Sequence, residues 1–322
     1  MTLPRINFAH LPTPVEAMPR LSAHLSGPQL FVKRDDQTGL GMGGNKTRKL
    51  EFVLAQALGA GARTLITVGG IQSNHCRQTA ALAAKFGLKC ILVLSGEEPI
   101  NVNGNLLLND LFDASVVWTT RDERDVTLNI VFQESVNRGE EPFLIPLGAS
   151  TAVGAVGYVE AMRELVGQGQ KFDWIIMASS SGGTQAGMVL GAELTQWNGR
   201  ILGISIDHSV EELQLTVSSL ANETAVLLNE NARFTMEQIH VNADYLGGGY
   251  AVAGPAEIEA IKLFGKSEGL LLDPVYTGRA AAGMMDLIRK GFFKKTDRVL
   301  FWHTGGAPAL FAPPYSQLLS TK

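Results

Sequence analysis

The segment Thr64–Gly70, with the sequence TLITVGG, decides the fold class of this chain. A buried-strand run ends in a glycine turn, and a helix-like stretch then continues to about Phe86. Further short apolar runs, each separated from the next by a segment long enough for a helix, lie at residues 90–94, 115–118, 143–145, 174–177, 201–206 and 299–302. Strands that alternate with helices require crossover connections, so the sequence predicts an α/β fold built on parallel sheets.

The composition limits the class of protein. The chain has 322 residues, enough for one large or two modest domains, and a content of 45% hydrophobic and 18% charged residues excludes wholesale disorder. The formal net charge of −4 argues against a nucleic-acid partner, and the chain has neither an apolar signal core near its start nor an apolar run of about 18 residues. The two cysteines, Cys76 and Cys90, cannot form a disulfide framework or a four-thiolate metal site. We therefore expect a cytoplasmic protein with no membrane partner and no metal.

Three predicted strands end in the same kind of turn. Residues 69–75, 178–184 and 303–306 each place glycines next to hydroxyl, amide or imidazole side chains, directly after a strand. One explanation is that such a turn does no more than cap the following helix. However, the carboxyl ends of the strands are where open α/β sheets bind ligands. Three such turns in one chain favour a ligand site.

Two nucleotide-binding motifs match only in part. Residues 39–44 satisfy G-x-G-x-x-G, but charged residues 33–36 precede them instead of a buried strand, and no acidic residue occurs between Phe52 and Gly96. The phosphate-binding lysine motif fails because Asn45 replaces its second glycine. Neither motif therefore supports a nucleotide site.

The acid-free stretch is locally positive. It contains Arg63, Arg77, Lys85 and Lys89, which suits a phosphate or a carboxylate substrate. The alternative is that these side chains lie on a solvated helix face.

Lys46 occupies an unusual place for a lysine. It follows a glycine pair and begins a predicted helix, where the helix dipole disfavours a cation, and Arg48 and Lys49 add positive charge. Both effects lower the pKa of an amine, as a lysine needs in order to react with a carbonyl group. The alternative is an ordinary surface lysine.

Several motifs together resemble one enzyme family. Residues 33–36 and 43–51 look like the lysine motif of pyridoxal-phosphate enzymes of fold type II, and more narrowly like the family of D-cysteine desulfhydrase, 1-aminocyclopropane-1-carboxylate (ACC) deaminase and L-cysteate sulfo-lyase. The match continues in family order through residues 69–75, 181–184, 272–278 and 302–310, so it covers almost the whole chain. The resemblance implies a tryptophan synthase β-like fold with two open parallel-sheet α/β domains, and a homodimer. The large domain would comprise residues 1–47 plus 159–322, and the inserted small domain residues 48–158.

The resemblance also implies roles for individual residues. Lys46 would bind pyridoxal phosphate covalently, while the groups that contact the cofactor besides Lys46 would be Lys49, Asn74, Gly182, Gly183, Thr184, Tyr276 and Thr304. Of these, Lys49 and the Gly182–Thr184 turn would hold the phosphate, Asn74 would bond the 3′ oxygen, and Thr304 would face the pyridine nitrogen. The residues implied to contact a small amino-acid substrate are Ser73, Asn74, His75 and Tyr250, and the implied catalytic residues are Lys46, Ser73, Tyr250 and Tyr276. For Tyr250 the alternative is an aromatic anchor of its loop.

Two threonines distinguish members of this family. ACC deaminases carry a glutamate where this chain has Thr277 and an apolar residue where it has Thr304. A neutral hydroxyl near the pyridine nitrogen leaves a weaker electron sink than a carboxylate does, which suffices for β-elimination of a good leaving group. The resemblance thus implies conversion of D-cysteine to pyruvate, hydrogen sulfide and ammonia. The alternatives are sulfite elimination from L-cysteate, ACC deamination and a cofactor-binding protein without catalysis.

Overall fold

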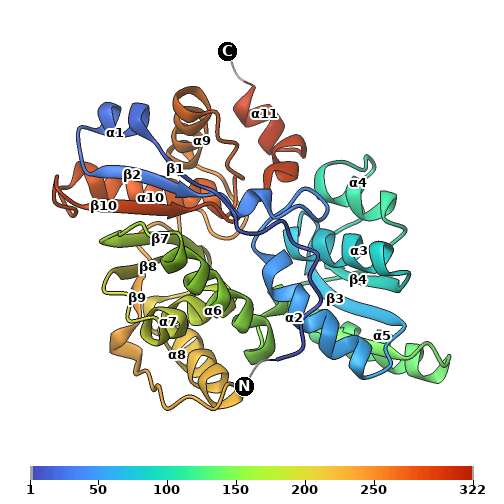
Figure 1. The fold of residues 1–322 in the computed structure, drawn as a ribbon. Helices are drawn as coiled ribbons and strands as arrows, with labels where there is room; N and C mark the ends of the chain where they lie inside the picture. Colours follow the sequence, from blue (N-terminus) through green and yellow to red (C-terminus); the bar gives the residue numbers. More distant parts are fainter. Residues whose placement is uncertain (1–2, 321–322) are drawn as a thin grey trace.

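The protein folds into two α/β units, each built on its own sheet (Figure 1). A computed structural model describes residues 3–320. The predicted α/β class with parallel sheets is confirmed. Within residues 3–320, no helix combines the length and apolarity that a bilayer span needs.

The larger sheet has six strands in the order β1-β2-β10-β7-β8-β9. Only β1 runs antiparallel to its neighbour. The strands are β1 (Val15–Ala17), β2 (Gln29–Lys33), β7 (Trp174–Ser179), β8 (Arg200–Ser205), β9 (His240–Asn242) and β10 (Arg298–Trp302).

Helices cover both faces of the larger sheet (Figure 1). One face packs against α1 (Pro19–Leu25), α9 (Pro255–Glu268) and α10 (Thr277–Arg289). The other face packs against α6 (Ala152–Gly167) and α7 (Gly183–Leu194), and α8 (Val210–Leu227) lies against these two helices. The chain closes with the short helix α11 (Tyr315–Leu319) after a 3-10 turn, η4 (Ala307–Phe311).

The smaller sheet has four parallel strands in the order β5-β4-β3-β6. They are β3 (Thr64–Gly70), β4 (Lys89–Ser95), β5 (Ser115–Thr119) and β6 (Pro142–Ile145). One face packs against α2 (Lys46–Gly59), α3 (Asn74–Phe86) and α4 (Gly104–Leu111), and α5 (Arg124–Asn137) covers the other. All four strands fall within residues 48–158, but the domain boundaries at 47/48 and 158/159 stay a prediction.

Every strand predicted from an apolar run is present, to within two residues at each end. Three strands escaped prediction: β1, β2 and β9. The statement that no buried strand precedes the glycine-rich segment 39–44 was wrong, because β2 ends at Lys33, which is fully buried.

A buried ion cluster explains how the charged residues Lys33 and Asp35 can lie in the interior. Arg48 Nη2 donates to Asp35 Oδ1 at 2.8 Å, and Arg48 Nη1 donates to Glu164 Oε2 at 2.9 Å. Lys33 Nζ donates to Glu164 Oε1 at 2.5 Å, and the Trp302 indole donates to Asp35 Oδ2 at 2.8 Å. Each buried charge therefore has an opposite charge as its partner, and the cluster joins β2 and β10 to helices α2 and α6.

Candidate active site

A cavity of about 710 Å³ lies between the two sheets, at the carboxyl ends of strands from both. Its wall includes Gly69 and Gly70 at the end of β3, Ser179 at the end of β7, and Thr304 just after β10. The three turns singled out in the sequence thus meet at one cavity, as open α/β sheets lead one to expect.

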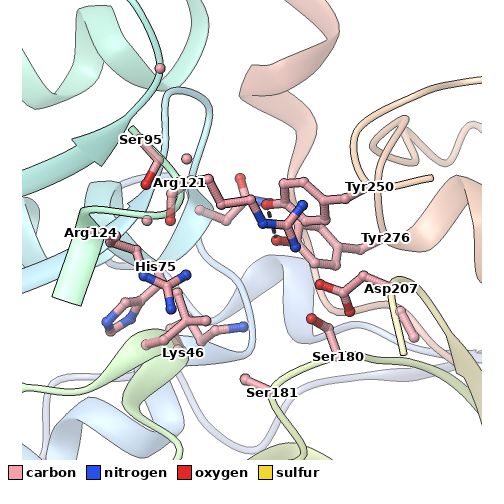
Figure 2. A pocket seen from close by; sticks show the side chains of 18 of the residues that line it. Lys46, His75, Ser95, Arg121, Arg124, Ser180, Ser181, Asp207, Tyr250 and Tyr276 are labelled. Atoms are coloured by element: carbon pink, nitrogen blue, oxygen red, sulfur yellow. Dashed lines mark hydrogen bonds between the residues drawn. The ribbon is translucent and has the colours of Figure 1, made fainter. Parts of the chain in front are cut away.

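Lys46 lines this cavity at the first turn of α2. Its Nζ donates to Asn45 Oδ1 at 3.1 Å, and Figure 2 shows the amine pointing into the open space. Burial lowers the pKa of Lys46 to about 8, and the Arg77 guanidinium adds to this effect while Asp273 opposes it. The pKa of Lys46 is therefore lowered, as predicted. However, the cation that contributes to this shift is Arg77, because the Arg48 guanidinium is engaged in the ion cluster.

The turn after β7 lies at the start of α7, where the sequence predicts an anion cradle. Gly182 has φ +77°, a conformation that L side chains rarely adopt, and a Cβ on Gly183 would lie 2.6 Å from Ser150 Oγ. The Gly183 amide already donates to Ser150 Oγ at 3.3 Å, so it is less free than the prediction assumed. Thr184 Oγ1 accepts from Asn45 Nδ2 at 3.0 Å, which leaves its own proton available to an anion. The first turn of α7 also offers backbone donors without helical partners.

Lys49 lies directly beside this cradle. Its side chain is buried, and its Nζ donates to the Gly148 carbonyl at 3.1 Å and to Ser150 Oγ at 3.2 Å. No carboxylate of residues 3–320 forms an ion pair with it, and a Cβ on Gly183 would lie 2.8 Å from its Nζ. Burial, together with the nearby Lys46 amine, holds the pKa of Lys49 well below its usual range. A buried lysine side chain without a counter-ion indicates a place for a bound anion, which would favour its charged form.

The start of α3 brings three predicted residues to the opposite wall of the cavity. Ser73 caps the helix by accepting from the Cys76 amide at 3.2 Å, and Asn74 Oδ1 accepts from Asn105 Nδ2 at 2.8 Å. His75 Nε2 lies 2.8 Å from Thr67 Oγ1. Because the Thr67 hydroxyl donates to the Ile145 carbonyl at 2.7 Å, His75 Nε2 must carry the proton and Nδ1 is left as an acceptor.

His75 has no hydrogen-bond partner at Nδ1 within the described part of the chain. Burial lowers its pKa well below the usual value, and the amines of Lys46 and Lys49 act in the same direction. The ring is therefore neutral at physiological pH and offers an acceptor atom at the cavity wall.

Tyr250 and Tyr276 form a hydrogen-bonded pair at the cavity (Figure 2). Their hydroxyl oxygens are 2.7 Å apart. Asp273 fixes Tyr276 by accepting from its backbone amide at 2.9 Å. Burial raises the pKa of both phenols, that of Tyr276 well above its usual value. Both hydroxyls thus keep their protons at neutral pH.

The two threonines that distinguish family members lie in different surroundings. Thr304 lines the cavity, and its carbonyl accepts from the Asn45 amide at 3.0 Å. Thr277 is buried, and its hydroxyl donates to Asp273 Oδ1 at 2.7 Å while accepting from the Asp273 amide. The Thr277 hydroxyl is therefore committed to Asp273, and the residue is not part of the described cavity wall.

The acid-free positive stretch does not form one patch. Arg63 is paired with Glu141 and Lys89 with Glu140 at the surface, and Lys85 is exposed. Arg77 alone is buried near the cavity, where its Nη2 donates to the Gly43 carbonyl at 2.8 Å. The interpretation of these residues as a common anion site was wrong because their helix and strands point them in different directions.

Sequence reasoning missed four residues that shape the site. Ser150 links Lys49 to the cradle, since its Oγ also lies 2.8 Å from Ser181 Oγ. It follows β6 in a Gly-Ala-Ser-Thr stretch, the same strand-end signal as the three turns, so it could have been found. Asn45, Arg121 and Asp207 also line the cavity and carried no such signal. The described residues contain no cluster of histidine, cysteine or acidic side chains that could hold a metal.

A family model described as pyridoxal-phosphate dependent enzyme matches residues 6–305 of the chain. The chain belongs to this family. The D-cysteine desulfhydrase of Salmonella typhimurium is 44% identical over 320 residues, with 96% of each chain covered, and that of Salmonella typhi is equally similar. A solved structure of an ACC deaminase homologue has a TM-score of 0.90 at 36% identity, covering 98% of this chain and 95% of its own. The fold type II architecture is thereby confirmed.

The residues at the cavity fit pyridoxal phosphate. The cofactor carries a phosphate dianion, and the buried Lys49 amine beside the Gly182–Gly183 turn, which has no counter-ion among the described residues, is where such a charge would be bound. It also carries an aldehyde, and Lys46 offers an amine whose lowered pKa makes the free base accessible near neutral pH. Lys46 lines the cavity, and Lys49 lies one helical turn further along α2, buried against Gly183 of the turn that also borders the cavity.

Proposed function

We propose that this enzyme catalyses the pyridoxal-phosphate-dependent β-elimination of D-cysteine, which yields pyruvate, hydrogen sulfide and ammonia. The observation that carries the proposal is the meeting of the Lys46 amine, the anion cradle and the Tyr250–Tyr276 pair at one cavity. The 44% identity to D-cysteine desulfhydrases over nearly the whole chain supports the choice of substrate. We further infer that the enzyme acts in the cytoplasm as a homodimer, as its family resemblance implies.

In this proposal, the cofactor is held at both ends. Lys49, Thr184 and the amides of Gly182 and Gly183 would bind its phosphate, and Lys46 would bind its aldehyde carbon. Asn74 would bond the 3′ oxygen through its Nδ2, because its Oδ1 already accepts from Asn105. The bound cofactor supplies an electron sink that makes the Cα–H bond of an attached amino acid acidic.

Lys46 is the proposed base for the Cα proton. An amine with a pKa of about 8 is partly unprotonated at neutral pH and still basic enough to hold the proton afterwards. Ser73, at the tip of α3, faces the same cavity and would bind the substrate carboxylate or assist proton transfer.

The tyrosine pair is the proposed donor to the leaving sulfur. Both hydroxyls are protonated, and the hydrogen bond between them lets one proton be replaced as the other is donated. Buried phenols that retain their protons at pH 7 can stabilise a thiolate as it forms.

The neutral side chain of Thr304 favours elimination over ring opening. It carries a hydroxyl, and the Thr277 hydroxyl is bound to Asp273. No glutamate stands at either position to keep a pyridine nitrogen protonated. A weaker electron sink suffices when a thiolate can leave at once.

A panel of D-cysteine, L-cysteine, L-cysteate and ACC tests the proposal, with ammonia and the 2-oxo acid measured for each. We expect D-cysteine to have the highest kcat/KM, and the Lys46→Ala variant to lose turnover on every substrate. Lys85→Ala is the matched control, since Lys85 is exposed on the far turn of α3. Ammonia release from ACC at a rate that matches D-cysteine turnover would overturn the proposal.

Sulfite elimination from L-cysteate is the second candidate. It is favoured by Arg121, a cation that lines the cavity and could contact the additional negative charge of a sulfonate. The same panel decides between the two, because L-cysteate as the best substrate would reverse the assignment.

A further inference from the structure

Two charged side chains of the cavity have no part in the reaction proposed above. Asp207 follows β8 and lies beside Ser180 and the tyrosine pair, and Arg121 belongs to the loop between β5 and α5 (Figure 2). Figure 2 shows the Arg121 side chain reaching across the cavity toward Tyr250 and Tyr276. One charge thus comes from the larger sheet and the opposite charge from the smaller one.

Asp207 is a largely buried carboxylate without a hydrogen-bond partner at one of its oxygens. Its side chain is 14% exposed, and within residues 3–320 no donor reaches Oδ1. The His208 Nε2 lies 3.6 Å from Oδ1, beyond hydrogen-bond distance. Burial is the main cause of the raised pKa of Tyr250 and Tyr276, and the negative charge of Asp207 raises both further.

Arg121 is exposed at the mouth of the cavity, and no carboxylate of the described residues is paired with it. Two acidic residues close to it in the sequence are engaged elsewhere. Glu123 Oε2 accepts from Thr120 Oγ1 at 3.1 Å, and Asp125 pairs with Arg124 at 3.0 Å. The guanidinium therefore keeps all its donors for a ligand.

The cavity is also large for a three-carbon amino acid. Its volume of about 710 Å³ lies in the range that holds drug-sized ligands. The cofactor would occupy part of this space, and Asp207 and Arg121 line the same cavity. A ligand group that satisfies an unpaired carboxylate and an unpaired guanidinium together is an ammonium next to a carboxylate, as in a second amino-acid group.

We propose that Asp207 and Arg121 form a subsite for a second amino-acid group, so that the enzyme accepts sulfur-linked bis-amino acids such as cystine. The inference rests on the proposed β-elimination. The Cα proton leaves, the Cβ–S bond breaks, and the electron pair departs with the disulfide sulfur as the anion of thiocysteine. Water then converts the three-carbon fragment to pyruvate and ammonia. No oxidant or reductant is needed, since the disulfide bond itself stays intact.

Four unreactive amino acids of similar length test the subsite in the holoenzyme. In their D-configured forms these are norleucine, with no distal charge; lysine, with an ammonium; 2-aminoadipate, with a carboxylate; and 2,6-diaminopimelate, with both. Their binding is measured by calorimetry and by competitive inhibition of D-cysteine turnover. We expect 2,6-diaminopimelate to bind at least about tenfold more tightly than norleucine, as one or more charge-assisted hydrogen bonds would provide.

Variants assign each charge to its partner. Asp207→Asn should remove the advantage of lysine over norleucine, and Arg121→Gln should remove that of 2-aminoadipate. Both should lower the ratio of kcat/KM for D-cystine to that for D-cysteine. Glu97→Gln is the matched control, because Glu97 is an acidic residue that lines the same cavity from the smaller sheet.

Several results would overturn the inference. Equal affinity of 2,6-diaminopimelate and norleucine excludes the subsite, and an effect of Glu97→Gln equal to that of Asp207→Asn shows only a dependence on total charge. Turnover of D-cysteine without turnover of D-cystine refutes the subsite while the proposed function stands. If D-cysteine itself is not a substrate, the proposed function fails, and calorimetry still tests the subsite.

Discussion

Replacement of Lys49 by methionine should change the free enzyme and the cofactor-bound enzyme in opposite directions. Lys49 is 1% exposed, and its only described hydrogen-bond partners are the neutral Gly148 carbonyl and Ser150 hydroxyl. Burying a lysine amine without a counter-ion costs several kcal/mol, whether the group stays charged or gives up its proton, whereas the two lost hydrogen bonds are worth roughly 1 kcal/mol each. Lys49→Met should therefore stabilise the apoenzyme by about 1–3 kcal/mol.

The same substitution should weaken cofactor binding. A hydrogen bond from an ammonium to a phosphate contributes about 1.5–3 kcal/mol, so the Kd for pyridoxal phosphate should rise roughly ten- to hundredfold. The assays are thermal or urea unfolding of the apoenzyme and a cofactor titration. Lys85→Met, on an exposed side chain, serves as the control and should change neither quantity.

The pH dependence of apoenzyme stability provides a second test of the role of Lys49. Because the pKa of Lys49 is lowered on folding, the unfolded chain binds more protons between that lowered pKa and 10.5. The stability of the wild-type apoenzyme should thus rise with pH across this window, and Lys49→Met should flatten the slope. An apoenzyme that is destabilised by Lys49→Met while its cofactor affinity is unchanged would refute the reasoning, since Lys49 would then be purely structural.

Three further predictions concern the reacting amine and the two threonines. The rate at which the apoenzyme captures pyridoxal phosphate should increase with pH with a midpoint near 8, because only unprotonated Lys46 is nucleophilic. Stopped-flow absorbance measures this rate, and a midpoint near 10.5 would contradict the burial of this amine. Thr304→Ala should retain the cofactor but slow Cα-proton removal about two- to tenfold, the effect of one hydrogen bond of roughly 0.5–1.5 kcal/mol; a deuterium isotope effect on kcat that does not grow would speak against it. Thr277→Val should lower the free energy of unfolding by about 1–3 kcal/mol, because it removes the hydroxyl that donates to Asp273 Oδ1 and leaves the buried Asp273 amide without an acceptor; a larger loss in kcat than in stability would instead place Thr277 at the reaction.

The parts of the fold that could be predicted are those coded by neighbouring residues. Strands β3, β4, β7, β8 and β10 are continuous apolar runs, because helices cover both faces of their sheets. The strand-end turns could be found for the same reason, since their glycines and hydroxyl side chains follow each other directly in the sequence.

Strand β2 could not be predicted because its environment is set by distant residues. Lys33 looks like a solvated lysine, yet it is buried against Glu164, which lies 131 residues further along the chain. The same limit applies to Lys46. Its lowered pKa was predicted, but the contribution of Arg77 depends on α3 packing beside α2, which no local pattern reveals.

The candidate site was predicted in outline, and the roles of its residues stay predictions. The sequence indicated which strand ends would carry polar groups, but it could not show which side chains face the cavity. Thr277 turns to Asp273, whereas Arg121 turns inward from a loop with no recognisable signal. Side-chain direction at helix starts and in loops depends on the surrounding packing, and packing is a property of the whole fold.

The buried ion cluster restricts how this enzyme can evolve. Lys33, Asp35, Arg48 and Glu164 come from three separate parts of the chain, and each neutralises another inside the protein. Loss of one member leaves an unpaired buried charge, at a cost of about 3–5 kcal/mol, which is a large share of the stability of a typical domain. Replacement of several members together by apolar residues would avoid this penalty, but each single substitution on the way to that state would incur it. The helix that carries Lys46 is thereby anchored by residues that mutation can change only as a group, so the reacting amine can keep its place while the cavity wall around it diversifies.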